Sequence, residues 1–273
     1  METSTIHNTQ TLSERLSTGA LNWYGAWTLY SREVKRFLKI WAQTVLGPMM
    51  TTLLFLTVFS LAIGGPDRSV AGVPFLEFLA PGLIIMAMMQ NSFANSSSSM
   101  MMGKVQGNII DLLMTPMGPA ELCLGFIAGG ATRGLVAGAV LVITVQPFVT
   151  VTPAHIAFIL FHAVAACVMM AALGLLGGLW AEKFDHMSAV TNFVIMPLTF
   201  LSGTFYSVER LPEVFYNISQ LNPFFYAIDG FRYGFIDRAD SNVMVGLAVL
   251  LTADVALWAL CHRLLARGYK IKP

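Results

Sequence analysis

The sequence predicts an all-α polytopic membrane protein with six transmembrane helices. Hydrophobic residues make up 56% of its 273 residues and charged residues only 11%, whereas an ordinary soluble domain carries about 25% charged residues. Six long apolar stretches follow one another, and lysines and arginines gather in alternate connections between them. A soluble protein of this composition would lack the polar surface it needs, so we expect the chain to lie in a membrane.

The apolar stretches have the length of transmembrane helices. A hydrocarbon core of roughly 30 Å needs about 20 residues at 1.5 Å per residue. We expect spans at about 41–63, 76–100, 121–147, 154–181, 186–206 and 243–265. Arg133 and Asp254 are the formal charges that lie deepest in them.

The segment at 21–39 predicts an amphipathic helix that lies in the membrane surface. Its apolar residues recur at steps of four and three, and its basic residues lie off that stripe. The stripe consists of Trp23, Trp27, Tyr30, Val34, Phe37 and Trp41, and the basic flank of Arg32, Lys35, Arg36 and Lys39. The alternative is a soluble helix packed on a partner. Residues 1–20 are polar and predict a flexible tail without a cleavable signal peptide.

The basic residues predict the orientation, because cytoplasmic loops carry the excess of Lys and Arg. With the amino terminus inside, the cytoplasmic side holds Arg15, Arg32, Lys35, Arg36, Lys39, Lys104, Lys183, Arg263, Arg267, Lys270 and Lys272. The other side holds only Arg68, Arg210, Arg232 and Arg238. We therefore expect both termini in the cytoplasm.

Two connections predict structure of their own. The cytoplasmic segment at about 104–116 predicts a short amphipathic helix that ends at Pro116. Its apolar residues are Ile109, Ile110, Leu112, Leu113 and Met114. The external segment at 207–236 is rich in Phe and Tyr and is interrupted at Asn222-Pro223. Because so aromatic a linker would not stay in water, we expect short re-entrant helices at the outer interface.

The second span ends in polar residues, which must face protein or water because lipid excludes them. They are Gln90, Asn91, Ser92, Asn95 and Ser96 to Ser99. Either they line a hydrated path that opens to the cytoplasm, or they form hydrogen bonds between helices. The sequence leaves both interpretations open.

Glycines at intervals of four predict close helix packing in the third and fourth spans. They are Gly125, Gly129, Gly130, Gly134, Gly138, Gly174 and Gly178. We expect this packing within one subunit rather than across a dimer seam.

Arg133 and Asp254 lie at similar depth, which favours a structural pair, or an arginine that extends to the interface, over a proton relay.

The sequence carries no signature of a nucleotide, metal or nucleic-acid site. Next to the Gly103-Lys104 pair, Ser98 and Val105 stand where a P-loop requires Gly and Ser or Thr. The 16 methionines favour adaptable apolar packing over Cu(I) transport, because no Cys or His joins them at ligand spacing. The net charge of +1 provides no basic surface for nucleic acid. We expect no cofactor in this chain.

Four motifs in this order resemble the permeases of type-2 ABC exporters. They are Phe-Leu-Ala-Pro-Gly-Leu at 78–83, Asn-Ile-Ile-Asp-Leu-Leu-Met-Thr-Pro at 108–116, Pro-Leu-Thr-Phe-Leu-Ser-Gly-Thr-Phe-Tyr at 197–206, and Leu-Asn-Pro at 221–223 with Gly-Phe-Arg-Tyr-Gly at 230–234. The resemblance extends from Trp23 onward. The chain is similar to inner-membrane transport permeases of the YadH type, and then to nodulation lipo-oligosaccharide and drug-resistance permeases.

The resemblance implies that two permease copies pair in the inner membrane and that each docks a separate ATP-binding cassette protein, which binds ATP and Mg. It implies a coupling helix at the ATPase contact, flanked by Glu33 of the interfacial helix. The coupling residues are Val105, Asn108, Ile109, Ile110, Asp111, Leu112, Leu113 and Met114. Lys104 departs from the acidic residue that such permeases often carry before this segment.

The resemblance also implies that spans one, two and five line the translocation path. Its candidate residues are Gln90, Asn91, Asn95, Phe200, Phe205 and Tyr206, the last three at an external gate. A narrow apolar path suits an amphiphile, such as a lipid, glycolipid or hydrophobic drug. Two alternatives compete with the exporter. An intramembrane enzyme would need converging catalytic groups, and a stand-alone secondary transporter or channel would predict an internal repeat.

Overall fold

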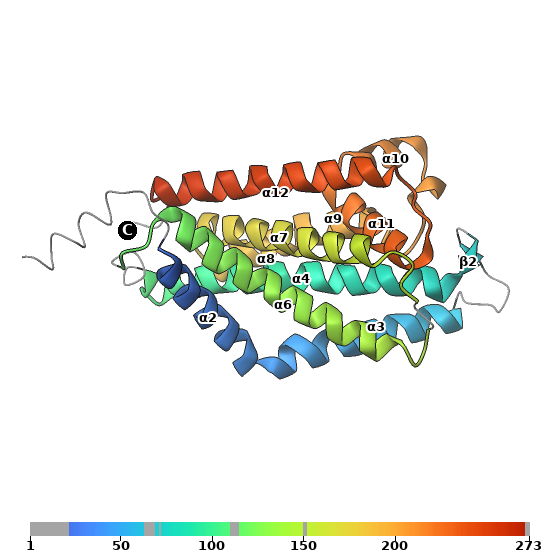
Figure 1. The fold of residues 1–273 in the computed structure, drawn as a ribbon, viewed down its shortest axis with the longest axis horizontal. Coiled ribbons are helices and arrows are strands. Elements are labelled where there is room, and N and C mark those ends of the chain that lie inside the picture. Colours follow the sequence, from blue (N-terminus) through green and yellow to red (C-terminus); the bar gives the residue numbers. More distant parts are fainter. Residues whose placement is uncertain (1–21, 63–68, 71, 110–114, 150–151, 271–273) are drawn as a thin grey trace, which may run out of the picture.

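A computed structural model describes residues 22–62, 69–70, 72–109, 115–149 and 152–270. It is an elongated bundle of roughly parallel and antiparallel helices, with α2 (Trp23–Lys39) at one end and α10 (Glu213–Gln220) and α11 (Pro223–Ile236) at the other (Figure 1). The carboxyl-terminal end of α12 (Val243–Ala266) lies at the α2 end. We call these ends of the bundle the α2 end and the α11 end.

Five helices of the described part are long and apolar enough to cross a membrane. They are α3 (Trp41–Ala62), α4 (Phe75–Val105), α6 (Pro119–Val145), α7 (Ile156–Trp180) and α12 (Val243–Ala266). The all-α polytopic class predicted from composition is confirmed. In the centre, α4 packs against α7 and α6, whereas α3 and α12 stay largely exposed.

The span expected at 186–206 forms three consecutive segments rather than one α-helix. They are α8 (Phe184–Val190), a π-helix (Thr191–Ile195) and α9 (Met196–Leu201). Pro197 has no N–H to donate to the preceding turn, and its ring crowds the carbonyl four residues earlier, which favours a wider π turn there. After α9 the chain turns at Gly203, whose φ of 77° lies in the left-handed region. The helix therefore ends earlier than expected.

The interfacial segment forms α2 (Trp23–Lys39), as its periodicity predicts. The Asn22 side chain caps its first turn by accepting a hydrogen bond from the Gly25 N–H at 3.0 Å. Trp23, Tyr24 and Trp27 are exposed, a feature that suits a lipid interface. The helix ends before α3 starts a new direction at Trp41 (Figure 1).

The glycine pattern packs helices within this chain, as expected. A Cβ atom added at Gly134 of α6 would lie 2.6 Å from the Met88 carbonyl oxygen of α4. One added at Gly129 would lie 2.5 Å from the Glu33 Cβ atom of α2. Both distances are shorter than van der Waals contact, so only glycine lets these backbones approach so closely.

Short elements form the α11 end. They are the hairpin β1 (Ser69–Val70) and β2 (Val73–Pro74), a 3-10 turn (Val208–Arg210), α10 (Glu213–Gln220) and α11 (Pro223–Ile236). The Asn222 side chain caps α11 by accepting from the Phe224 N–H at 3.1 Å. The break predicted at Asn222-Pro223 is therefore the start of a helix, and the hairpin was not predicted.

Candidate functional site

A buried polar network joins α2 to α4. Glu33 is fully buried and accepts hydrogen bonds from Arg36 Nη2 at 3.0 Å and from Ser99 Oγ at 2.7 Å. Arg36 Nη2 also donates to the Asn95 carbonyl at 2.8 Å and to Asn95 Oδ1 at 2.9 Å. A buried carboxylate is tolerated when it is paired and hydrogen-bonded, as here. The network thus connects Glu33, a predicted coupling residue, with Asn95, a predicted path residue.

The role of Arg36 in this network was not predicted from the sequence. The helical periodicity places it in the exposed basic flank of α2, yet its guanidinium turns inward between Glu33 and α4. The i, i+3 spacing of Glu33 and Arg36 was the available signal. By contrast, Arg32 contacts Glu33 at 3.4 Å and keeps 54% of its side chain exposed.

The polar residues of α4 divide between the two interpretations that the sequence left open. Ser96 Oγ donates to the Phe126 carbonyl of α6 at 3.2 Å, which is an interhelical hydrogen bond. Ser92, also buried, bonds within its own helix to the Met88 carbonyl at 3.0 Å. Gln90 and Ser98 instead line a cavity. One face of α4 therefore holds the bundle together, and another faces open space.

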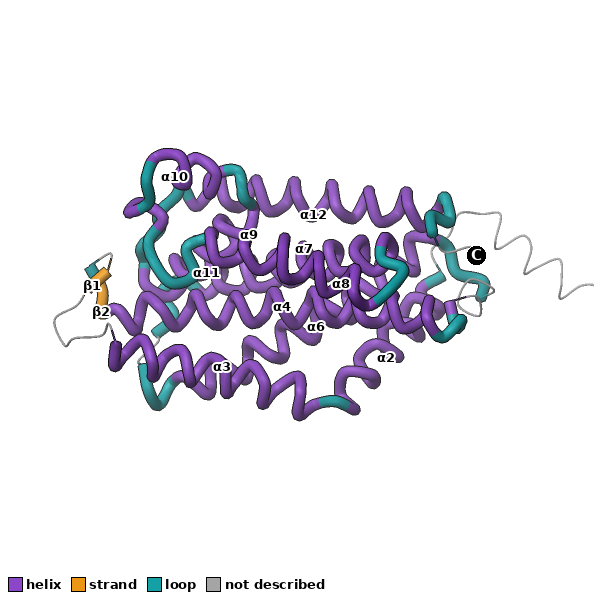
Figure 2. Tube along the Cα trace, turned by 180° about the vertical axis from the view of Figure 1, so that it is seen from behind, coloured by secondary structure: helices purple, strands orange, loops and turns teal. Residues whose placement is uncertain are grey.

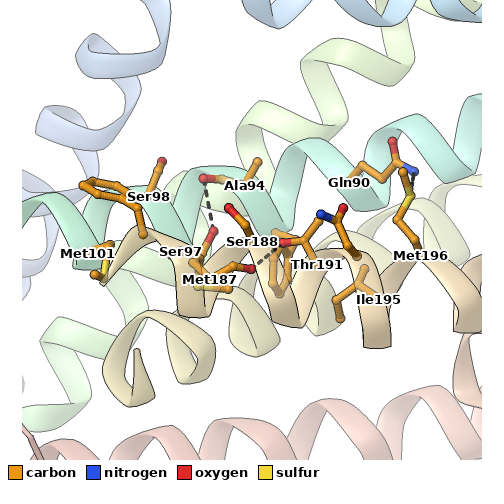
Figure 3. Close-up of a pocket in the computed structure, with 13 residues that line it drawn as sticks. Gln90, Ala94, Ser97, Ser98, Met101, Met187, Ser188, Thr191, Ile195 and Met196 are labelled. Carbon is orange, nitrogen blue, oxygen red and sulfur yellow. Dashed lines mark hydrogen bonds between the residues drawn. The ribbon is translucent and has the colours of Figure 1, made fainter. Parts of the chain in front are cut away.

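The cavity lies between α4 and the segments α8 to α9 and has a volume of about 390 Å³. Figure 3 shows residues of both walls directed toward it, and Figure 2 shows α8 beside α4. Its polar residues, all uncharged, are Gln90, Ser97, Ser98, Ser188, Thr191 and Asn192. Its apolar residues include Phe93, Met101, Phe184, Met187 and Met196. Such a surface can hold an uncharged polar group beside an apolar chain.

Asn91 lines a second, smaller hollow of about 120 Å³ between α3 and α4. Thr52 and Phe55 form its α3 side. Of the three polar path residues, the structure thus places Gln90 and Asn91 at cavities and Asn95 inside the network with Arg36.

The predicted gate aromatics form a cluster near the α11 end. The Phe205 ring centroid lies 5.5 Å from that of Phe200, 5.5 Å from Phe55 and 5.4 Å from Phe59. Tyr206 Oη donates to the Phe200 carbonyl at 3.2 Å. Phe55 and Phe59 of α3 were not predicted. Their spacing of four residues on a span was compatible with ordinary lipid contact, so no distinct signal marked them as part of a cluster.

Part of the predicted coupling segment lies outside the described residues, namely Ile110, Asp111, Leu112, Leu113 and Met114. Val105 is exposed at the end of α4, and Ile109 is buried in the cluster that contains Leu29 and Leu122. Asn108 lines an open cleft of about 870 Å³ between α2 and the end of α4. The basic residues Arg32, Lys35 and Lys39 line the same cleft.

Lys104 holds the end of α7 instead of facing solvent. Its Nζ donates to the carbonyls of Leu179 at 2.8 Å and Gly178 at 3.3 Å. These carbonyls lack helical partners, and a cation there also offsets the negative end of the helix dipole. The departure from the acidic residue of similar permeases therefore has a structural explanation.

The expected pairing of Arg133 with Asp254 is wrong. Among the described residues no ion pair joins them, and both Arg133 Nε and Asp254 Oδ1 are buried without a hydrogen-bond partner. Two side chains at a similar depth in the membrane can still point to different sides of their helices. The helix that carries Asp254, α12, packs chiefly against α7 and α11 rather than against α6. Arg133 is also nearly fully buried, so its head group does not extend to a surface.

Comparison with known proteins agrees with this architecture. Residues 24–236 match the family model of the ABC-2 type transporter. The chain is 36% identical over 249 residues to the inner membrane transport permease YadH of Escherichia coli K12, covering 91% of this chain and 97% of the relative. It is 26% identical over 255 residues to nodulation protein J of Rhizobium leguminosarum bv. viciae, covering 92% and 96%. The chain therefore belongs to the ABC-2 type transporter family, as a multi-pass permease of the inner membrane.

Proposed function

We propose that this permease is the membrane subunit of an ATP-driven exporter, and that a separate ATP-binding cassette protein binds ATP and Mg and powers it. The observation that carries the proposal is the hydrogen-bonded connection from Glu33 on α2 through Arg36 to Asn95 on α4. It joins the cleft beside Asn108, where an ATPase would dock, to the helix that lines the cavity. A movement of α2 is thereby passed to α4.

The substrate that we propose is an amphiphile, such as a lipid, glycolipid or hydrophobic drug. The cavity wall combines uncharged hydrogen-bonding groups with Met and Phe side chains and has no formal charge. A hydrated ion would need charged or closely spaced carbonyl ligands. The mixed surface therefore favours a molecule with both a neutral polar part and an apolar part.

A second copy of the chain completes the proposed path. The spans α3 and α12 are largely exposed, and Phe193 on the π-helix is 81% exposed. In this proposal the α8 to α9 side faces the partner, and lipid covers the remaining apolar surface. The α2 end faces the cytoplasm with both termini, in agreement with the distribution of Lys and Arg. Nucleotide drives export by binding one of the two conformations better than the other.

The proposal is tested by purifying the tagged chain in mild detergent and assaying the ATPase activity of whatever co-purifies. We expect a stoichiometric cassette protein, and we expect Val105→Asp combined with Asn108→Arg to remove it. Both side chains are exposed, so these changes leave the fold intact. Arg238→Gln, an exposed residue in the connection between α11 and α12, is the control. A stable protein that transports without any ATPase would instead make it a stand-alone secondary transporter.

A further inference from the structure

Three of the sequence motifs meet at one side chain, Arg232 of α11. It is 2% exposed, and its Nε donates to the Phe78 carbonyl of α4 at 3.3 Å. Its Nη2 donates to the carbonyls of Gly203 at 2.7 Å and Thr204 at 3.4 Å, in the turn after α9. The guanidinium carbon also lies 3.8 Å from the centroid of the Phe78 ring, a cation–π contact. Arg232 therefore fastens α11 to both α4 and this turn.

The charge of Arg232 is balanced without a carboxylate in direct contact. In the described part of the chain, no acidic side chain lies within ion-pair distance of it. Asp229, one turn earlier, accepts instead from the backbone N–H groups of Asp240 at 2.8 Å and Ser241 at 2.9 Å. A buried cation held by carbonyl dipoles depends on keeping those carbonyls in place. Moving the turn would leave the guanidinium short of acceptors.

Gly82 allows α4, Arg232 of α11 and the turn after α9 to approach one another closely. A Cβ atom added at Gly82 of α4 would lie 2.5 Å from the Thr204 carbonyl oxygen and 2.9 Å from Arg232 Nη2. The contact between α4 and the turn thus has no room for any other residue. The Phe-Leu-Ala-Pro-Gly motif supplies both the carbonyl that binds Arg232 and the glycine beside it.

The turn that Arg232 holds also carries the aromatic cluster. Phe205 directly follows Thr204, and its ring contacts Phe55 and Phe59 of α3. We propose that Arg232 is a positioning residue for transport, a latch that keeps Phe205 against α3 and so holds the path closed at the α11 end. Opening then requires the Gly203 and Thr204 carbonyls to leave Arg232, whose bond to Phe78 holds it on α4. This inference rests on the proposed function only for the direction of transport.

Hydrogen bonds to two carbonyls suit a reversible latch. They can be exchanged for water when the turn moves, whereas a buried ion pair would leave a second uncompensated charge. The closed arrangement is therefore stable, and it can still open when water replaces these two carbonyl acceptors. Two discrete arrangements of one turn are sufficient to gate a path.

The test uses the full chain with its three native cysteines replaced by alanine and a reporter, Ser207→Cys, at a position that is 4% exposed. A membrane-impermeant maleimide is applied to right-side-out and inverted vesicles, and the labelling rate is measured without nucleotide. We expect Arg232→Gln to raise the rate by roughly tenfold or more, because it shifts a minor open state toward dominance. Arg232→Lys keeps the positive charge but loses the several N–H donors of the guanidinium. Its labelling rate should therefore lie between those of the parent protein and Arg232→Gln.

Gly82→Ala leaves Arg232 unsubstituted but crowds its contact with the turn from the α4 side, and it should raise the rate as well. Gly103→Ala in the same helix is the matched control, because the nearest atom to a Cβ there lies 3.7 Å away, at ordinary van der Waals distance. Arg238→Gln, an exposed arginine of the same connection, is the second control. A separate reporter, the native Cys123 kept as the single cysteine and fully buried near α2, must keep its low labelling rate, which separates gate opening from unfolding.

Unchanged labelling of Ser207→Cys in both Arg232→Gln and Gly82→Ala would overturn the latch. Equal acceleration at both reporters in every variant would overturn it too, because Arg232 would then only support the fold. The assay needs neither ATP nor a partner protein. Failure of the latch is therefore distinguishable from failure of the exporter proposal, which the co-purification tests.

Discussion

At the scale of single residues, the buried carboxylate of Glu33 is stabilised by the hydrogen-bond donors around it. Its carboxylate is fully buried on a helix whose other face is exposed, and it accepts from Arg36 and Ser99. Removing one partner of a buried pair leaves the other uncompensated. Arg36 would keep its bonds to Asn95, and it is partly exposed, which moderates the cost.

We expect Glu33→Ala to lower the free energy of unfolding by about 2 kcal/mol, the range for lost hydrogen bonds to a charged group. Glu33→Gln should cost less, because its amide oxygen still accepts from Ser99. The free energy of unfolding is measured in detergent micelles, with tryptophan fluorescence as the signal of unfolding. Arg32→Gln is the control and should change stability by less than about 0.5 kcal/mol, because that arginine is half exposed. Equal effects of Glu33→Ala and Arg32→Gln would contradict the role of the network.

At the scale of elements, close backbone contact between α4 and α6 explains the glycine spacing. Gly134 faces the Met88 carbonyl and the Ser92 side chain, so an added methyl group has no free volume. The α3 helix shows the opposite situation at Gly47, which faces open space. The pair provides a direct comparison of two helical glycines.

Gly134→Ala should destabilise the protein by about 1–3 kcal/mol, as overpacking of a filled interior does. Gly47→Ala should cost much less, because no other helix lies within 4 Å of its Cβ atom; it gains nothing from helix preference, because Pro48 follows it. Thermal denaturation in detergent, read by loss of the monodisperse gel-filtration peak, measures both. A fall in Gly47→Ala as large as that in Gly134→Ala would show that α6 is not specifically packed on α4.

Hydropathy and periodicity predicted the helices because each depends on local sequence. The segment at 186–206 was less predictable, since the effect of Pro197 on the preceding turn is a matter of backbone geometry that hydropathy does not contain. Similarly, the polar face of α4 divides between Ser96, which bonds α6, and Gln90, which lines the cavity. The pattern identified these residues but not their neighbours.

At the scale of the whole molecule, contacts between distant helices decide which predictions hold. Arg133 and Asp254 fail to pair because α12 packs chiefly elsewhere, a fact that no local pattern contains. Glu33 and Asn95, 62 positions apart, are joined by an arginine that looked like part of a solvated flank. The resemblance to a family supplied the candidate residues, and tertiary structure supplied their connections.

The turn after α12 is tied to the loop after α7 by Lys270 and Glu182, whose Nζ and Oε1 atoms lie 2.8 Å apart. The hydrogen bond from Lys270 lowers the pKa of Glu182, and the same bond raises the pKa of Lys270. A carboxylate with a lowered pKa contributes stability above its unfolded-state value, and that contribution is lost as the pH falls through the lowered pKa.

Glu182→Gln should therefore melt at a slightly lower temperature than the parent protein at pH 7. The difference should disappear below the ordinary carboxylate range, at about pH 3. High salt should reduce it at pH 7, because both side chains are exposed and screened. Lys270→Met should reproduce the effect. A difference that persists unchanged at pH 3 would assign it to packing instead of charge.

The length of α4 has a mechanical consequence. The helix continues from Phe75 to Val105 with Pro81 inside it, next to Gly82 and Arg232. The part beyond Pro81 is about 36 Å long at 1.5 Å per residue, and the missing backbone hydrogen bond at a proline is where a helix bends most easily. A tilt of about 5° about that point would carry Val105 through about 3 Å, calculated from the same rise. A small bend of α4 at Pro81, beside Arg232, would therefore displace Val105 at the other end of the helix, where we propose that an ATPase docks.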